Sequence, residues 1–567
     1  MPSIIRRPLA GGAVALTALA IAGTAFAATP AAAADETGPK NVIVLIGDGM
    51  GYNFVDLANA HTSGETYYQV TTGGDKKVIP AGSNADRPTE GFQSWDLAGM
   101  STHWAEGPAY DPAESWTDFE WNKNDPTDSA AAGTAMATGV KTYNAGIGVD
   151  VDENVVENLS ERANSLGKST GVVTSVPFSH ATPAAYSAHN VSRNDYHGIA
   201  AQQLSGEMDV VIGAGHPFYD DDNQPLATPN YQYVGQAEWE AATSGASDYA
   251  FLETNEDFEA LTEGDTPEQV FGVPQVGSTL QQGRTDTGAK NDVPGLATLT
   301  EGALNVLDNN DSGMFLMVEG GAIDWTGHAN QTDRALEETL DFNDAVDSVI
   351  DWVETESSWD ETLVVVTADH ETGYLSGPVE GQFTPMTVEN HLDYATHSWN
   401  STNHTNQLVP FFYKGAGAEQ LTALADQRDP LRGHYLDNTE MAQWLLTSAW
   451  VEAAPPTPTA TTEPTATTEP TATTAPTATA TTEPTATTAP TATATTEPTA
   501  SATASATAPA TAGPAPTSTS ATGQGGDSLA TTGAEGAAPI AIGAGLLLAA
   551  GITVALVARR RAATERE

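Results

Sequence analysis

The chain has 567 residues, no cysteine, and 74 Asp and Glu against 21 Lys and Arg, which gives a formal charge of −53. Without cysteine, disulfides and a cysteine nucleophile are excluded, and any metal must be bound by His, Asp, Glu or hydroxyl groups. The acidic charge excludes a nucleic-acid binder, because such a protein neutralises phosphates with clustered Lys and Arg.

Residues 1–34 have the features of a secretion signal. Two arginines at positions 6 and 7 precede an apolar run, and the small residues that end at Ala27 and at Ala34 offer cleavage sites. The arginine pair also resembles a twin-arginine signal, but its flanking residues fit that motif poorly, so both export routes stay open. We expect the mature chain to begin near residue 35 and to lie outside the cell.

Residues 35–452 are predicted to form the globular domain. Short apolar runs that end in glycine or in polar residues are typical of buried parallel strands, and they lie at Val42 to Ile46, Val210 to Ile212, Met314 to Val318 and Leu363 to Thr367. Helical patterns cover 152–166 and 333–354. The alternation predicts an α/β fold with a central, mostly parallel sheet and helices on both faces.

Residues 453–527 are almost wholly Thr, Pro and Ala with a few Glu, in units that repeat about every six residues. This composition cannot bury a core, so we expect an extended, disordered stalk.

Residues 528–567 contain the pentapeptide Leu529-Ala530-Thr531-Thr532-Gly533, an apolar span from Ile540 to Ala558 and three arginines. The span alone predicts a single-pass membrane anchor with an extracellular catalytic domain. The order of pentapeptide, span and basic tail resembles a sortase sorting signal. That resemblance implies cleavage after Thr532 and attachment of Thr532 to the cell wall by sortase.

Asp48, Glu319, Asp369 and His370 each lie at or just beyond the end of a predicted strand. Ligands of such sheets bind beyond the carboxyl ends of the strands, so these side chains should meet in one crevice. A single acid in such a position is usually a helix cap or a loop residue. Four together, with a histidine among them, favour a metal site.

Asp324 and His328 add a carboxylate and an imidazole four residues apart, which share a face on a helical turn. His404 precedes another apolar run; a lone histidine there is more often a packing residue. Oxygen and nitrogen ligands without sulfur suit zinc and magnesium.

Ser129 precedes an alanine-rich stretch that is typical of the start of a helix. The ordinary interpretation of such a serine is an N-cap. A helix N-terminus also attracts anions such as phosphate, which makes Ser129 a candidate nucleophile.

Eight motifs, in unbroken order between about Lys40 and Gly415, together resemble the alkaline phosphatase family. They are Asp48-Gly49-Met50-Gly51, Thr127-Asp128-Ser129-Ala130, Thr138-Gly139-Val140-Lys141-Thr142, Ala181-Thr182-Pro183-Ala184-Ala185, Val318-Glu319-Gly320, Asp324 with His328, Thr367-Ala368-Asp369-His370, and His404-Thr405.

Carried over position by position, the resemblance implies two zinc ions and one magnesium ion. The implied ligands are Asp324, His328 and His404 for the first zinc, Asp48, Asp369 and His370 for the second, and Asp48, Thr182 and Glu319 for magnesium. The resemblance also implies that Ser129 is the nucleophile and that Arg193 clamps the phosphoryl oxygens. A planar guanidinium matches two phosphate oxygens, although a surface ion pair is the plain alternative for Arg193.

The implied activity is the hydrolysis of small phosphate monoesters through a phosphoserine. Zinc makes a serine hydroxyl nucleophilic, and a pair of metals stabilises the attacking and leaving oxygens of the displacement. Homodimers are usual in this family, so a homodimer is a further possible state of the chain.

Two positions depart from the best-known bacterial pattern. His180 replaces an Asp near the magnesium, and Trp325 replaces a Lys near the phosphate. The first change leaves open which metal fills the third site. The second removes a cation, so we expect weaker inhibition by product phosphate.

Phosphodiesterases, sulfatases and metal-dependent phosphoglycerate mutases share this general fold and use a similar two-metal arrangement. Sulfatases require Pro and Arg two and four residues after the nucleophile, where this chain has Ala131 and Gly133. Diesterase side activity stays open. A wall-bound adhesin or phosphate-binding protein is the alternative from another class, and the presence of every implied zinc ligand argues against it.

Overall fold

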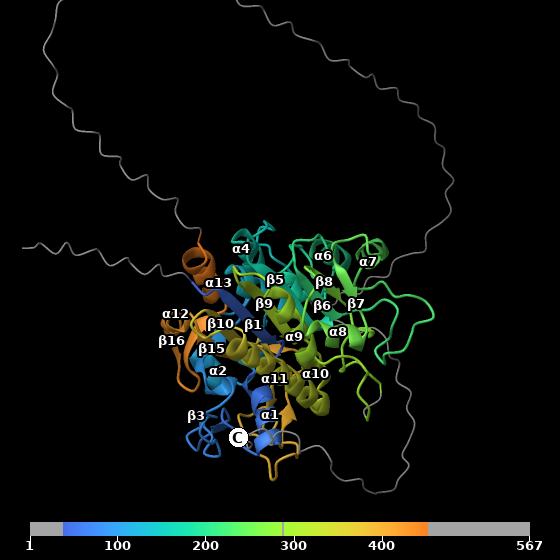
Figure 1. Ribbon diagram of the computed structural model, residues 1–567. Helices are drawn as coiled ribbons and strands as arrows, with labels where there is room; N and C mark the ends of the chain where they lie inside the picture. The colour runs from blue at the N-terminus through green and yellow to red at the C-terminus, as the bar shows by residue number, and fades with distance from the viewer. Residues whose placement is uncertain (1–37, 286–287, 452–567) are drawn as a thin grey trace, which may run out of the picture. The chain divides into compact units, whose positions relative to one another are not determined.

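The computed structural model describes residues 38–285 and 288–451 (Figure 1). By its internal contacts the chain divides into two units, Met1–Thr461 and Thr462–Glu567, and every described residue belongs to the first. The predicted signal, stalk and sorting signal therefore lie outside the described residues. Within the described ranges, no helix is both long and apolar enough to cross a membrane.

The described part of the chain contains one sheet of eleven strands. Their spatial order is β16 (Gln427–Asp429), β17 (Gly433–Asp437), β4 (Asp96–Ser101), β15 (Val409–Gly415), β10 (Thr362–Thr367), β1 (Asn41–Gly47), β9 (Met314–Gly320), β5 (Ser169–Pro177), β6 (Val210–Ala214), β8 (Val270–Gly272) and β7 (Ala250–Leu252).

Pairing is parallel from β10 through β1, β9, β5, β6 and β8 to β7. At the other edge, β15 runs antiparallel to β10 and to β4, and β16 runs antiparallel to β17. The predicted strands are confirmed as β1, β6, β9 and β10. All residues of these four strands are buried, as expected for apolar strands covered on both faces.

Thirteen helices of the described residues surround the sheet. They are α1 (Tyr52–Ser63), α2 (Pro112–Thr117), α3 (Ser129–Thr138), α4 (Leu159–Ser165), α5 (Ala181–Ala185), α6 (Tyr196–Gln203), α7 (Gln236–Thr243), α8 (Asn255–Leu261), α9 (Leu296–Leu307), α10 (Ala322–Ala329), α11 (Thr332–Thr355), α12 (Ala418–Leu424) and α13 (Glu440–Trp444).

Ten of these helices fall into two groups by their contacts. One contains α1, α8, α9, α10 and α11, with α9, α10 and α11 in front of the strands in Figure 1. The other contains α3, α4, α5, α12 and α13, which contact one another or the strands. The predicted α/β class with a mostly parallel sheet is confirmed.

Shorter elements complete the described ranges. The 3₁₀ turns are η1 (Phe92–Ser94) and η2 (Trp121–Lys123), and η3 (Leu445–Ala449) is a π-helical turn. Small two-stranded sheets pair β2 (Val70–Thr72) with β3 (Val78–Pro80), β11 (Glu371–Thr372) with β14 (His404–Thr405), and β12 (Leu375–Ser376) with β13 (Ser398–Trp399).

One predicted helix is wrong in its first half. The pattern predicted a helix over 152–166, but α4 begins at Leu159. Asn158 and Glu161 form a capping box that starts the helix there. Upstream, the Asp150 carboxylate accepts hydrogen bonds from the backbone N–H groups of residues 152 and 154, and this local turn competes with helix formation.

The strand register brings several carboxyl ends to one level. Ile46 of β1 lies opposite Glu319 of β9 and Thr367 of β10, and Thr174 of β5 also lies opposite Glu319. The segments that follow β1, β9 and β10 therefore begin side by side.

Candidate metal centre

The predicted metal ligands come from separate segments that meet at this end of the sheet. Asp48 follows β1, Asp369 and His370 follow β10, Asp324 and His328 lie on α10, and His404 begins β14. Gly49, next to Asp48, has a φ of +73°, and a Cβ there would lie 2.7 Å from Thr372 Oγ1. Glycine lets this turn approach β11 closely.

Asp324, His328 and His404 form one set of donors whose ligand atoms face one another. Asp324 Oδ2 lies 3.3 Å from His328 Nε2. His404 Nε2 lies 3.4 Å from Asp324 Oδ1 and 3.1 Å from His328 Nε2. Two imidazole nitrogens and a buried carboxylate at these distances are a donor set suited to zinc.

Backbone carbonyls hold the far sides of both imidazoles. His328 Nδ1 lies 2.7 Å from the Thr402 carbonyl oxygen, and His404 Nδ1 lies 2.7 Å from the Thr127 carbonyl oxygen. Because a carbonyl only accepts, each Nδ1 must carry the proton, and each Nε2 presents its lone pair to the site. The tautomers are thus fixed for metal binding.

Asp48, Asp369 and His370 form the second set. His370 Nε2 lies 3.4 Å from Asp48 Oδ1 and 3.2 Å from Asp369 Oδ2. Asp369 Oδ1 accepts hydrogen bonds from the backbone N–H groups of Gly49 and His370. Both Asp48 oxygens and Asp369 Oδ2 are buried and accept no hydrogen bond from the described residues. Buried carboxylate oxygens need a partner, and a divalent cation fits them.

His370 lies at the border between the two sets. The donor atoms of Asp324, His370 and His404 lie within 4.8 Å of one another, as do those of Asp48, Asp369 and His370. The His370 and His404 rings are stacked, with their centroids 3.6 Å apart. The two donor sets therefore adjoin.

The pKa values of the buried carboxyl groups in this centre are shifted by burial and by their charged neighbours. Burial and the neighbouring Asp369 raise the pKa of Asp48 well above its usual range. Burial and Asp324 raise the pKa of Asp369 to about 7. Burial also acts to raise the pKa of Asp324, but His328 and His404 outweigh it and hold that pKa well below the usual range. Bound cations would reverse this competition, since they stabilise the ionised carboxylates.

Glu319 and Thr182 provide donors for a third position. Glu319 Oε2 accepts a hydrogen bond from Thr174 Oγ1. Glu319 Oε1 and Thr182 Oγ1 are buried without a hydrogen-bond partner among the described residues. Burial raises the pKa of Glu319 to about 7. Oxygen donors of this kind fit magnesium.

His180 and Trp325, the two departures from the family pattern, lie together. Their ring centroids are 5.7 Å apart, edge to face. His180 is buried, and burial together with the Arg193 charge lowers its pKa to about 3. His180 is therefore neutral at ordinary pH.

Ser129 is the first residue of α3 and not its N-cap, so the ordinary alternative for this serine does not hold. Asp128 caps the helix instead, because its carboxylate accepts a hydrogen bond from the Ala131 N–H. The Ser129 hydroxyl is therefore not used for capping. Its Oγ lies 3.2 Å from His370 Nε2, next to both donor sets.

Arg193 is buried rather than part of a surface ion pair. Its Nη1 donates to Asp128 Oδ2 at 3.1 Å, and its Nη2 lies 3.5 Å from His180 Nε2. Asp128 thus holds both the start of α3 and the guanidinium. A buried cation near Ser129 can bind an anion.

Sequence reasoning missed Asp128 and Thr372 as supporting residues. Thr372 Oγ1 donates to Asp324 Oδ1 at 2.5 Å and lies 3.2 Å from His370 Nδ1. An aspartate before an alanine-rich run is itself an N-cap signal and could have revealed Asp128. Thr372 carries no comparable signal, because its partner Asp324 is distant in the chain.

The fold and site define an α/β protein with two adjoining metal-donor sets beside a buried serine. A model of the family described as "Alkaline phosphatase" matches residues 39–393. Alkaline phosphatase 4 of Bacillus subtilis (strain 168) is 34% identical over 384 residues, which cover 66% of this chain and 71% of that protein. The alkaline phosphatase of Escherichia coli (strain K12) is 28% identical over 434 residues, which cover 69% of this chain and 84% of that protein.

Solved structures agree in fold. The cold-active alkaline phosphatase from Shewanella sp. aligns with a TM-score of 0.52 at 23% identity, covering 72% of this chain and 99% of that one. The alkaline phosphatase from the Antarctic bacterium TAB5 aligns with a TM-score of 0.51 at 23% identity, covering 73% of this chain and 100% of that one. The chain belongs to the alkaline phosphatase family and is a phosphomonoesterase.

Proposed function

We propose that the chain is an extracellular phosphate monoester hydrolase that uses two zinc ions, one magnesium ion and a phosphoserine formed on Ser129. The observation that carries this proposal is the position of Ser129 Oγ, 3.2 Å from His370 Nε2, at the border of the two donor sets. A hydroxyl buried beside paired donor sets is suited to phosphoryl transfer.

The unpartnered buried oxygens support the metal assignment, and the fixed histidine tautomers agree with it. The proposed ligands are Asp324, His328 and His404 for one zinc, Asp48, Asp369 and His370 for the other, and Asp48, Thr182 and Glu319 for magnesium. When bound, these ions supply positive charge that activates a hydroxyl nucleophile and stabilises a leaving oxygen.

In this proposal Arg193 binds the phosphoryl group and Ser129 attacks it. The Arg193 guanidinium binds two phosphoryl oxygens of the substrate. Ser129 Oγ attacks phosphorus in line with the ester oxygen. The Oγ–P bond forms as the ester P–O bond breaks, and the alcohol leaves with a proton. In the second step water attacks phosphorus, phosphate leaves, and Ser129 regains its proton.

Replacement of the nucleophile tests the proposal. We expect Ser129→Ala to lose almost all activity on an aryl phosphate. Ser160→Ala is a matched control, because Ser160 Oγ is also buried and lacks a hydrogen-bond partner among the described residues, but it lies on α4. Acid quenching of the wild-type reaction followed by mass spectrometry should find phosphate on Ser129. A Ser129→Ala variant as active as wild type would refute the proposal.

Metal analysis of the purified protein tests the cofactors. We expect two zinc ions and one magnesium ion per chain, and loss of activity with a chelator that zinc plus magnesium restores. A panel of monoester and diester substrates, assayed on the same preparation, should favour monoesters. Activity that survives complete metal removal would contradict the assignment.

We also propose that the enzyme is secreted and attached to the cell wall through Thr532. The sequence of residues 1–34 and 528–567 supports this location. Cell fractionation tests it, since wall digestion should release the enzyme in a sortase-containing host but not after Thr532→Ala. Recovery of the wild-type enzyme in the membrane fraction would instead favour the single-pass anchor.

A further inference from the structure

Glu371 is a buried acid that directly follows the ligand His370. It is the first residue of β11, and only 2% of its surface is exposed. Burial raises its pKa to about 7, against the opposing effect of the Thr405 hydrogen bond. Neither the proposed metal sites nor the reaction uses this side chain.

The carboxylate of Glu371 bridges two segments that carry ligands. Glu371 lies opposite Thr405 in the pair of β11 with β14. Thr405 Oγ1 donates to Glu371 Oε2 at 2.5 Å, and the Leu375 N–H donates to Glu371 Oε1 at 3.2 Å. Since Thr405 follows His404, these bonds connect the segment of His370 with that of His404.

The same side chain packs against the turn that carries Asp48. A Cβ on Gly51 would lie 2.3 Å from Glu371 Cγ, so the backbone at Gly51 is in close contact with Glu371. The neighbouring Thr372 N–H donates to the Gly49 carbonyl oxygen at 3.1 Å. Glu371 therefore lies where the segments of Asp48, His370 and His404 meet.

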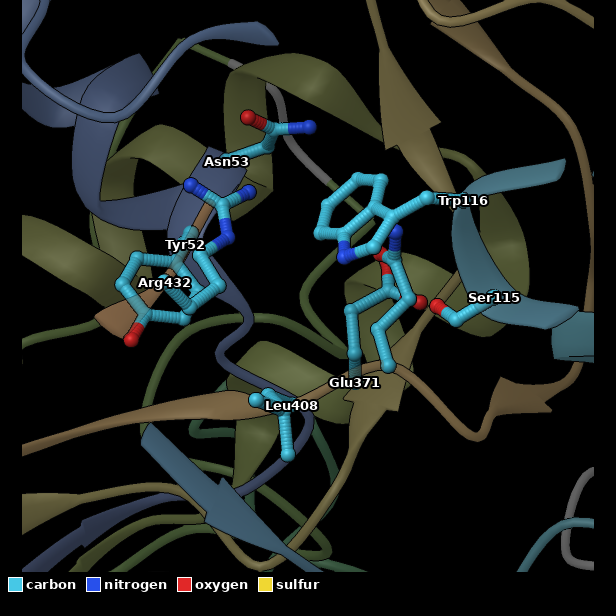
Figure 2. Close-up of a pocket in the computed structure, with 8 residues that line it drawn as sticks. Tyr52, Asn53, Ser115, Trp116, Glu371, Leu408 and Arg432 are labelled. Carbon is cyan, nitrogen blue, oxygen red and sulfur yellow. The ribbon is translucent and has the colours of Figure 1, made fainter. Parts of the chain in front are cut away.

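The outer side of Glu371 borders a small cavity (Figure 2). Tyr52, Trp116 and Arg432 also line it. The Arg432 guanidinium lies 4.0 Å from the Tyr52 ring centroid and donates to the Tyr68 carbonyl oxygen. The cavity borders Glu371 on one side, and the hydrogen bonds from Thr405 and Leu375 together with the contact at Gly51 hold its other sides.

We propose that Glu371 is a positioning residue of the metal centre. It holds the β14 segment with His404 at a fixed distance from the β11 segment that follows Asp369 and His370. The proposal rests on the proposed function, because it requires these side chains to bind zinc.

Zinc affinity tests the proposal directly. Metal-free full chain is titrated with zinc against a chelating dye, for wild type and four variants. We expect Glu371→Ala and Thr405→Val to weaken zinc binding about 10- to 100-fold, the usual effect of losing a residue that supports a metal ligand. Thr405→Val keeps the shape of that residue, so it still tests the bridge if Glu371→Ala does not fold.

Glu371→Gln separates position from charge. An amide has the same shape, accepts the Leu375 hydrogen bond and can donate to Thr405 Oγ1. We expect zinc affinity close to wild type. Glu338→Gln is the matched control, because Glu338 is also buried but lies on α11; its zinc affinity should be unchanged.

The outcomes distinguish the two proposals. If wild type binds no zinc, the proposed function fails. If wild type binds zinc and either folded Glu371→Ala or Thr405→Val binds it equally well, the positioning role is overturned while the proposed function stands. A Glu371→Gln variant as weak as Glu371→Ala would also overturn it, because charge rather than position would then be the cause.

Discussion

Substitution of Asp128 should separate the start of α3 from the placement of Arg193. One carboxylate oxygen accepts from the Ala131 N–H at 2.9 Å. The other accepts from the Ala145 N–H at 2.9 Å and from Arg193 Nη1 at 3.1 Å. In Asp128→Asn the amide oxygen can still cap the helix, but the amide nitrogen is a donor and cannot hold the guanidinium.

The size of the effect follows from the freedom that Arg193 regains. Immobilising one long side chain costs about 0.5–1.5 kcal/mol, and an Arg193 that is no longer fixed must meet this cost when it binds phosphate. We therefore expect kcat/KM of Asp128→Asn to fall about 2- to 10-fold. Asp128→Ala should lose the same activity and a further ~1 kcal/mol of unfolding free energy, because the cap is also gone.

The assay combines kinetics with unfolding. We would measure kcat/KM on an aryl phosphate, the inhibition constant of phosphate, and the free energy of unfolding in urea. An Asp128→Asn variant with wild-type kcat/KM and wild-type phosphate inhibition would refute the idea that Asp128 holds Arg193. An alanine variant as stable as the asparagine variant would refute the capping role.

Three further predictions concern charge. Trp325→Lys restores a cation near the phosphate, so phosphate should inhibit roughly 3- to 10-fold more strongly; unchanged inhibition counts against this. Burial, with Asp341 and Glu337, raises the pKa of Glu338 to about 8. The folded state therefore keeps a proton that the unfolded state releases near its ordinary pKa of 4.5. The free energy of unfolding should fall by about 5 kcal/mol as the pH rises from about 4.5 to about 8, and Glu338→Gln should flatten this decline in urea unfolding. The formal charge of −53 predicts a melting temperature that rises with NaCl, because salt screens repulsion among the acids; a steady fall would contradict it.

Four of the proposed ligands, Asp48, Asp369, Asp324 and His328, could be predicted to converge because local signals place them. Asp48 and Asp369 each follow an apolar run, and parallel strands with level carboxyl ends bring such residues together. The spacing of Asp324 and His328 places both on one face of α10 in the same way.

The supporting contacts were not predictable, because they join segments that are distant in the chain. The carbonyl oxygens of Thr127 and Thr402 hold His404 and His328, but backbone groups leave no trace in the sequence. The bridge from Glu371 to Thr405 depends on pairing of β11 with β14, two strands too short to give a pattern. The start of α4 was missed because a local turn at Asp150 overrides helical spacing.

The two donor sets meet only when segments from distant parts of the domain have come together. Asp48 lies at the end of the first strand, whereas His404 lies on β14, near the end of the described residues. Bringing together segments so distant in the chain costs loop-closure entropy, which slows folding. A nascent chain lacks His404 until most of the domain has been synthesised. For a chain exported unfolded, which is one of the two export routes that the sequence leaves open, the proposed zinc site would therefore be complete only after export.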